Sequence, residues 1–305
     1  MRIAVLGAGA VGLSVAARLS RVADVVAVTR ERYAAAIRQD GFHLTGRWGD
    51  GVYDLAVTTG LNPSEEFDYV VITAKSVDTA AVCREFSDIL ARTEVVSLQN
   101  GIGNEEIIAG VANRVIGGMI ITGFEWRSTN AVHVSVEGGP MKLGRYPAGM
   151  DPAVETLVDM VRDAGIPVEG TTSIRTDIWG KTMYNCALNP LGALMNVPYG
   201  RLVDPHALAI IEAIVTEIYA VARSQGVALA WPDPSSYITF LVSTQLPSTS
   251  DHHSSMLQDL ARGRRTEIDF LNGAIAAIGA RHGVPTPFNA CIADLIRFRE
   301  SLAGG

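Results

Sequence analysis

Cysteine is scarce in this chain of 305 residues, and its three copies, Cys83, Cys186 and Cys291, lie far apart without a CxxC pair. This spacing argues against a disulfide framework and a cysteine-rich metal site, and it favours a reducing compartment. Charge is also modest, since 19% of the residues are charged and the net charge is −7. Because no overall positive field attracts nucleic acid or an anionic membrane, we expect neither as a partner, and local groups must hold any anionic ligand.

Long apolar runs are missing, although 48% of the residues are hydrophobic. We find no stretch of the length that a membrane span requires. Residues 1–19 combine a basic residue with an apolar run, as a signal peptide does, but glycines at positions 7, 9 and 12 interrupt that run. We therefore expect a cytoplasmic protein with about two globular domains.

A glycine-rich turn follows the first apolar segment. Residues 2–6 have the composition of a buried parallel strand, Gly7-Ala8-Gly9-Ala10-Val11-Gly12 comes next, and a helical pattern follows. In this context the first glycine permits the turn, the second lets a pyrophosphate approach, and the third lets the helix pack on the strand. The pattern predicts a Rossmann-type dinucleotide-binding domain that holds the phosphates at the helix N-terminus.

The strand expected at residues 25–29 ends at Arg30, where an NAD-binding site usually carries an acidic residue. A guanidinium suits the 2′-phosphate of NADPH, and Arg32 follows close by. The sequence therefore favours NADPH over NADH. In the alternative, Arg30 is an ordinary surface residue and Glu31 binds the ribose.

Two further expected strands end in polar residues. Residues 68–74 are followed by Lys75, and residues 93–98 by Gln99-Asn100-Gly101. Because ligands of doubly wound sheets bind beyond the carboxyl ends of the strands, we expect Lys75 and Asn100 to face the cofactor. The alternatives are a solvated strand end at Lys75 and plain turn chemistry at Asn100.

The rest of this half predicts mixed elements. We expect a hairpin within residues 42–59, a strand at 115–122, and two strands at 133–136 and 141–144 that pair around Gly138-Gly139-Pro140. An amphipathic helix at 151–164 and an edge strand at 166–168 follow. The nucleotide-binding domain is thus expected to cover residues 1–168.

Residues 169–305 are expected to form a helical domain. A helix from Trp179 to Leu194 places Lys181, Asn185 and Asn189 one turn apart on one face. Buried polar groups need partners, and a small anionic or carbonyl-bearing ligand would supply them. In the alternative, this is a solvated helix face. Further helices are expected at 208–225, 232–246 and 289–302, with Pro247 as a break.

Metal binding is not expected, although His252 and His253 attract attention. Adjacent histidines point to different faces, and no acidic residue lies at ligand spacing.

Taken together, these motifs resemble the ketopantoate reductase (2-dehydropantoate 2-reductase) family over nearly the whole chain. The resemblance rests on the glycine-rich turn, Lys75, Gln99-Asn100-Gly101, the run from Trp179 to Pro190, and the C-terminal run Ser254-Ser255-Met256-Leu257-Gln258-Asp259, Thr266-Glu267-Ile268-Asp269 and Asn272-Gly273. It implies an α/β Rossmann domain followed by an all-α domain like the C-terminal domain of 6-phosphogluconate dehydrogenase, with a substrate cleft between them. It also implies NADPH-dependent reduction of 2-dehydropantoate to pantoate, a step toward pantothenate and coenzyme A.

The same resemblance assigns roles to individual residues. Lys181 is expected to be the catalytic lysine and Glu267 its acidic companion. Asn185, Asn189, Ser255 and Asn100 are expected to bind substrate. Lys75 and Asn100 are expected near the nicotinamide, and Arg30 is expected to select NADPH. The chemistry agrees, because a ketone that accepts hydride becomes an alkoxide and needs a nearby proton donor.

Other readings stay open for several of these residues. Ser255 could be a helix cap, and Glu267 with Asp269 could serve a helix N-terminus. The segment Phe124–Arg127 departs from the family pattern and could reshape the cleft near the nicotinamide. The alternatives in function are a reductase of another 2-oxo acid and an NADPH-binding redox sensor; a homodimer is possible.

Overall fold

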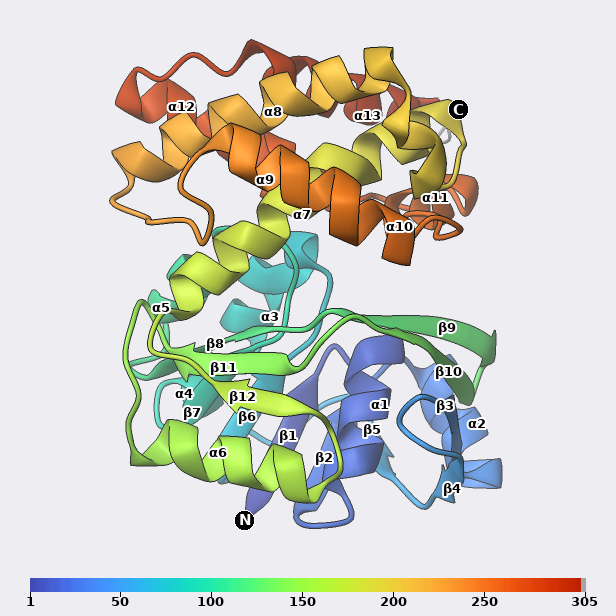
Figure 1. Cartoon of the computed structure of the whole chain (residues 1–305). Coiled ribbons are helices and arrows are strands. Elements are labelled where there is room, and N and C mark those ends of the chain that lie inside the picture. The colour runs from blue at the N-terminus through green and yellow to red at the C-terminus, as the bar shows by residue number, and fades with distance from the viewer. Residues whose placement is uncertain (303–305) are drawn as a thin grey trace. The chain divides into compact units, whose positions relative to one another are not determined.

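The computed structural model describes residues 1–302, which Figure 1 draws as a ribbon. The chain divides into two compact units. The first contains Met1–Gln99 and Asn104–Arg175, and the second contains Asn100–Gly103 and the chain from Thr176 onward. The short loop at residues 100–103 therefore belongs with a part of the chain that follows it by more than seventy residues.

The first unit is built on an eight-stranded sheet in the order β12-β11-β8-β7-β6-β1-β2-β5. Its strands are β1 Arg2–Leu6, β2 Asp24–Val28, β5 Ala56–Thr58, β6 Tyr69–Ile72, β7 Glu94–Ser97, β8 Val115–Met119, β11 Met141–Arg145 and β12 Val168–Gly170. All neighbouring pairs are parallel except β8 with β11. This arrangement confirms the α/β class expected from the sequence.

Helices cover both faces of this sheet, and alternate residues of β1 show it. Ile3 and Val5 belong to one apolar core, while Ala4 and Leu6 belong to the other. Because successive strand side chains point to opposite faces, both faces of β1 are buried, as its unbroken apolar sequence requires. The covering helices are α1 Ala10–Leu19, α2 Glu31–Asp40, α3 Thr79–Glu85, α4 Ser87–Leu90, α5 Asn104–Ala109 and α6 Pro152–Asp163.

A second sheet in this unit has the order β4-β3-β10-β9. Its strands are β3 Phe42–Gly46, β4 Gly51–Tyr53, β9 Thr122–Ser128 and β10 Ala131–Glu137. The hairpin expected within residues 42–59 is present as antiparallel β3 and β4. The expected pairing of residues 133–136 with 141–144 is wrong, because β10 pairs with β9 and β3, whereas β11 pairs with β8 and β12. The tight β9–β10 connection and the burial of Val132 and Val134 fix this choice.

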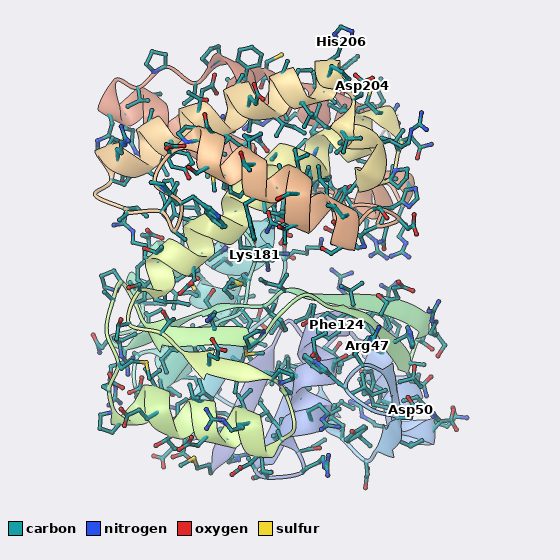
Figure 2. The ribbon with its side chains drawn as sticks, in the orientation of Figure 1. Arg47, Asp50, Phe124, Lys181, Asp204 and His206 are labelled. Atoms are coloured by element: carbon teal, nitrogen blue, oxygen red, sulfur yellow. The ribbon has the colours of Figure 1, made fainter. Side chains whose placement is uncertain are left out.

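The segment Phe124–Arg127 lies within β9, and its two aromatic rings pack inside the first unit. Trp126 stacks on Tyr33 of α2 with 4.6 Å between ring centroids, and Phe124 meets Trp48 edge-on at 5.1 Å. Figure 2 labels Phe124 on this sheet, together with Arg47 and Asp50 from the β3–β4 connection. These contacts give the segment a packing role, while an effect on the cofactor stays a prediction.

The second unit has no strand between Thr176 and Leu302, in agreement with the expected helical half. Its helices are α7 Ile174–Met195, which begins in the first unit, α8 Pro205–Ser224, α9 Pro234–Phe240, α10 Leu246–Ser248, α11 Ser255–Ala261, α12 Asn272–His282 and α13 Pro287–Ser301. The helix expected at 232–246 passes through a π-helical turn at Leu241–Gln245 and ends just after Pro247 rather than before it.

Helix α8 lies in the core of this unit. Its residues Ile211, Ile214, Val215 and Ile218 are completely buried, and Asp204 caps its first turn by accepting from the backbone N–H of His206 at 2.9 Å (Figure 2). By length and hydropathy alone α8 could cross a membrane, which corrects the expectation that no stretch is long enough. The core helix of a globular domain passes the same test, so this is weak evidence for a span.

Candidate active site

The glycine-rich turn has the geometry that a dinucleotide phosphate requires. Gly7 has a φ of +66°, and a Cβ there would lie 2.4 Å from the Cβ of Ala74. A Cβ on Gly12 would lie 2.2 Å from Oγ1 of Thr73, so the start of α1 packs directly on the neighbouring strand end. A Cβ on Gly9, in contrast, would meet nothing within 4 Å. The first and third glycines therefore serve packing, while the second leaves open space beside the N-terminus of α1, where a phosphate fits.

Arg30 lies at the end of β2, next to this turn. The two are tied together because the Thr29 hydroxyl donates to the carbonyl of Ala8 at 2.6 Å. Glu31 is paired with Arg38 at 3.0 Å, and Arg32 lies over the ring of Tyr33. The guanidinium of Arg30 is exposed and makes no hydrogen bond or ion pair within residues 1–302.

A buried polar network joins the carboxyl ends of β6 and β7 in the first unit. The side-chain amide of Gln99 donates to the carbonyl of Ala74 at 2.9 Å and to the Thr79 hydroxyl at 2.7 Å. That hydroxyl in turn donates to Asn104 at 2.8 Å. Half-buried Lys75 lies in the turn that this network holds. Our sequence analysis missed Thr79 and Asn104, which lie beyond the polar strand ends, at the starts of α3 and α5.

Lys181 is one end of a hydrogen-bonded chain in the second unit, and Figure 2 labels it on α7. Its ammonium donates to Oδ1 of Asn100 at 2.6 Å, and Nδ2 of Asn100 donates to Oε2 of Glu267 at 3.1 Å. The sequence predicts Asn100 beside both the cofactor and the substrate, and in the structure it contacts the two catalytic candidates. Three residues from distant parts of the sequence thus form one site.

The loop that carries Asn100 is held by its backbone. The N–H of Ile102 donates to the carbonyl of Phe270 at 2.8 Å. Gly101 has a φ of +87°, and a Cβ there would lie 2.3 Å from the same carbonyl. A larger residue would push the loop away, so Gly101 allows the close approach that brings Asn100 to Lys181 and Glu267.

Burial makes Lys181 a better proton donor than an ordinary lysine. Desolvation lowers the pKa of Lys181 to about 8, and the negative charge of Glu267 opposes part of that shift. Glu267 itself is nearly buried, directly before the short helix Ile268–Phe270. At neutral pH the amine is therefore mostly protonated and releases its proton more readily than a solvated lysine.

The other predicted substrate-binding residues differ in their burial and in their hydrogen bonds. Asn185 is half-buried and makes no side-chain hydrogen bond within residues 1–302. Asn189 is 6% exposed and accepts a hydrogen bond from the hydroxyl of Tyr199, a residue that our sequence reading missed. Ser255 is exposed at the first turn of α11, and no hydrogen bond within residues 1–302 joins it to Lys181.

The helix cap at this place is Ser254, not Ser255. Its buried hydroxyl accepts from the backbone N–H of Leu257 at 3.0 Å. The alternative reading of Ser255 as a cap is therefore wrong, because only the residue before the first helical turn has the backbone geometry to cap it.

This chain is similar to known proteins over nearly its whole length. Residues 3–148 match the family model described as "Ketopantoate reductase PanE/ApbA", and residues 173–300 match the model of its C-terminal part. The 2-dehydropantoate 2-reductase of Pyrococcus horikoshii is 35% identical over 100% of this chain and 99% of the relative. That of Archaeoglobus fulgidus is 32% identical over 98% of each chain.

A solved structure extends the likeness to the fold. The PanE/ApbA family ketopantoate reductase from Ralstonia eutropha JMP134 matches with a TM-score of 0.90 and 30% identity, and the match covers 100% of both chains. Sequence and structure agree over the full length, and the chain belongs to the ketopantoate reductase family.

Proposed function

We propose that this protein reduces 2-dehydropantoate to pantoate with NADPH, a step toward pantothenate and coenzyme A. The observation that carries the proposal is the chain Lys181–Asn100–Glu267, which holds one partly buried ammonium in a fixed place. Two relatives more than 30% identical over essentially the whole chain are 2-dehydropantoate 2-reductases, which supports the same activity.

NADPH is the expected cofactor, and when bound it supplies the hydride. Residues 7–12 would hold its pyrophosphate, because Gly9 leaves space at the start of α1. Arg30 would bind the 2′-phosphate, since its guanidinium is exposed and Glu31 is paired with Arg38. We assign Lys75 and Asn100 to the nicotinamide end.

In the reaction, Lys181 acts as the general acid. As the ketone carbon gains hydride, negative charge develops on its oxygen, and Nζ of Lys181 transfers a proton to that oxygen to give the alcohol. The neutral amine then regains a proton from water. Asn100 holds the amine in position, and the negative charge of Glu267 preserves part of the proton affinity of Lys181. We assign the substrate's carboxylate and hydroxyl groups to Asn185, Asn189 and Ser255.

Steady-state oxidation of NADPH with 2-dehydropantoate tests this function, run beside NADH and a panel of other 2-oxo acids. We expect efficient turnover of 2-dehydropantoate, a preference for NADPH, and loss of activity in Lys181→Ala. Turnover of another 2-oxo acid without turnover of 2-dehydropantoate would identify that acid as the substrate. Binding of NADPH without any turnover would make the protein a sensor and overturn the proposal.

We assign residues 1–168 to the Rossmann NADP-binding domain and residues 169–305 to the helical substrate-binding domain. The placement of Gly7–Gly12 and Arg30 in one unit and of Lys181 and Glu267 in the other supports this division. The three separate cysteines favour the cytoplasm, where thiols stay reduced.

We also propose a homodimer that forms through α13. Phe288, Leu295, Phe298 and Leu302 are 44%, 44%, 61% and 58% exposed. Together with exposed Cys291, they repeat at alternating spacings of three and four residues. This is the pattern of a coiled-coil seam, and in a parallel pair Asp294 would lie across it from Arg299 of the partner subunit.

The oligomeric state of Phe298→Glu tests the dimer. We expect a dimer for the wild-type protein and a monomer for the variant in sedimentation, while Arg281→Glu on α12 stays dimeric. A monomeric wild-type protein would refute this association.

A further inference from the structure

Tyr199 is held rigidly beside the polar face of α7. Its backbone N–H donates to the carbonyl of His252 at 3.0 Å, and the next residue, Gly200, donates to Ser250 at 2.8 Å. Its ring meets Tyr184 edge-on, with 6.1 Å between centroids, and His252 at 5.3 Å. The side chain is 2% exposed, so the direction of its hydroxyl is set by packing.

That hydroxyl donates to Oδ1 of Asn189. Burial raises the pKa of Tyr199 far above its usual value, so the group stays a donor at any physiological pH. If the Asn189 carboxamide were reversed, its N–H groups would face Tyr199 and the buried hydroxyl proton would lack an acceptor. The oxygen of Asn189 is therefore held at Tyr199.

The opposite side of the carboxamide is then fixed as well. Nδ2 of Asn189 makes no hydrogen bond to any residue between 1 and 302, and it lies on the helix face that also carries Asn185 and Lys181. An amide whose oxygen is engaged can only donate at its other end. The side of the Asn189 carboxamide that faces away from Tyr199 consequently offers N–H donors.

We infer that Tyr199 is a positioning residue that turns Asn189 so that this part of the site takes an acceptor oxygen of the substrate. The inference rests on the proposed function. It makes Asn189 selective, because a carboxylate or hydroxyl oxygen accepts from an amide N–H, whereas an ammonium group finds no acceptor there. Both groups of 2-dehydropantoate that flank its ketone can supply such an oxygen.

A double-mutant cycle of Tyr199→Phe and Asn189→Ala tests the inference. The readouts are KM and kcat for 2-dehydropantoate, and the dissociation constant of pantoate from the shift in Tm that it causes. Loss of one oriented hydrogen bond is expected to raise KM and this dissociation constant roughly 3- to 10-fold in Tyr199→Phe, with kcat within about twofold. In the Asn189→Ala background the same change should have no further effect, because Tyr199 acts through Asn189.

Tyr184→Phe is the matched control. It removes the hydroxyl that contacts Oγ1 of Thr249 at 3.1 Å in the same aromatic cluster, and we expect KM to stay unchanged. A substrate analogue without the hydroxyl, 3,3-dimethyl-2-oxobutanoate, identifies the oxygen. If Tyr199→Phe still raises KM for this analogue, Asn189 binds the carboxylate. If it no longer raises KM, Asn189 binds the hydroxyl. Both outcomes support the inference.

Additive effects of the two variants, or a folded Tyr199→Phe protein with unchanged KM and pantoate affinity, would overturn the inference. If Tyr199→Phe does not fold, Asn189→Asp replaces it. The second carboxylate oxygen of the aspartate would face the ligand, so KM should rise above that of Asn189→Ala. A KM equal to that of Asn189→Ala would contradict the inference. Failure of the proposed function is distinct, because the wild-type protein would then neither turn over 2-dehydropantoate nor bind pantoate.

Discussion

The side-chain amide of Asn272 donates a hydrogen bond of 3.2 Å to the backbone carbonyl of Cys186. In an α-helix this carbonyl would accept from the N–H of residue 190, but residue 190 is a proline and has none. Asn272, which is completely buried at the start of α12, thus supplies the donor that Pro190 removes from α7. The same amide also donates to Asn289 of α13 at 3.0 Å, which connects three helices.

Asn272→Leu should therefore destabilise the protein by about 2–3 kcal/mol, because it leaves buried acceptors without donors. Urea denaturation measures this loss. Pro190→Ala restores a helical N–H to Cys186, so it should recover part of the stability in the Asn272→Leu background. A double variant no more stable than Asn272→Leu alone would show that the Cys186 carbonyl is not the source of the cost.

The activity should depend on the protonation of Lys181. Because burial lowers the pKa of Lys181 to about 8, the protonated donor is present below that pH and is lost above it. We expect kcat/KM for ketone reduction to be level near neutral pH and to fall about tenfold per pH unit well above 8. A pH–rate profile measures this, and a rate that holds up to pH 10 would exclude Lys181 as the acid.

Stability should change in the opposite direction over the same range. The folded-state pKa of Lys181, about 8, lies below its usual value of 10.5, so the unfolded chain binds more protons between these two values. This group therefore makes the protein more stable as the pH rises through that window. The free energy of unfolding of the wild-type protein is measured across this pH range and compared with that of Lys181→Met. Because this variant lacks the Lys181 contribution, the difference separates Lys181 from other titrating groups.

Glu267→Gln should move the descending limb of the rate profile to lower pH. The charge of Glu267 raises the pKa of Lys181, so its removal lets desolvation lower that pKa further, below about 8. Asn100 can still donate to the amide oxygen of the glutamine, which keeps the geometry. Asp269→Asn is the control, since that carboxylate is already paired with Arg297 at 2.6 Å, and its profile should stay unshifted.

Two glycines of the same motif should respond differently to alanine. Gly9→Ala places its Cβ in open space, so it should fold with a change in stability below about 1 kcal/mol but bind NADPH poorly. Gly12→Ala would put its Cβ 2.2 Å from Thr73, and it should lose more than about 2 kcal/mol in stability. Thermal unfolding and NADPH fluorescence titration separate the two, and tight NADPH binding by Gly9→Ala would argue against a phosphate at this turn.

Arg30→Ala should weaken NADPH binding by roughly 10-fold or more while leaving NADH binding nearly unchanged, because a charge-assisted contact to the 2′-phosphate is lost. Arg38→Ala is the control, since Arg38 lies on the helix that follows Arg30 and is paired with Glu31. Equal losses of affinity for NADPH and NADH would show that Arg30 does not bind the 2′-phosphate.

The local signals in the sequence were strong where one segment carries a whole motif. The glycine-rich turn between a strand and a helix, the unbroken apolar strands and the row of Lys181, Asn185 and Asn189 each depend on spacing within a few residues. The structure confirms the elements, α1 and α7 among them, because periodicity and turn chemistry act locally.

Tertiary structure decided which partners these elements meet. The sequence could not assign β10 to a second sheet, because strand pairing depends on contacts between segments far apart in the chain. It also could not bring Asn100 to Lys181, turn Asn189 toward Tyr199, or show that Asn272 completes the helix at Pro190. The sequence by itself determined the fold class and the residues able to do the chemistry, whereas long-range packing decided which of them touch, since burial and hydrogen-bond satisfaction are set by the whole fold.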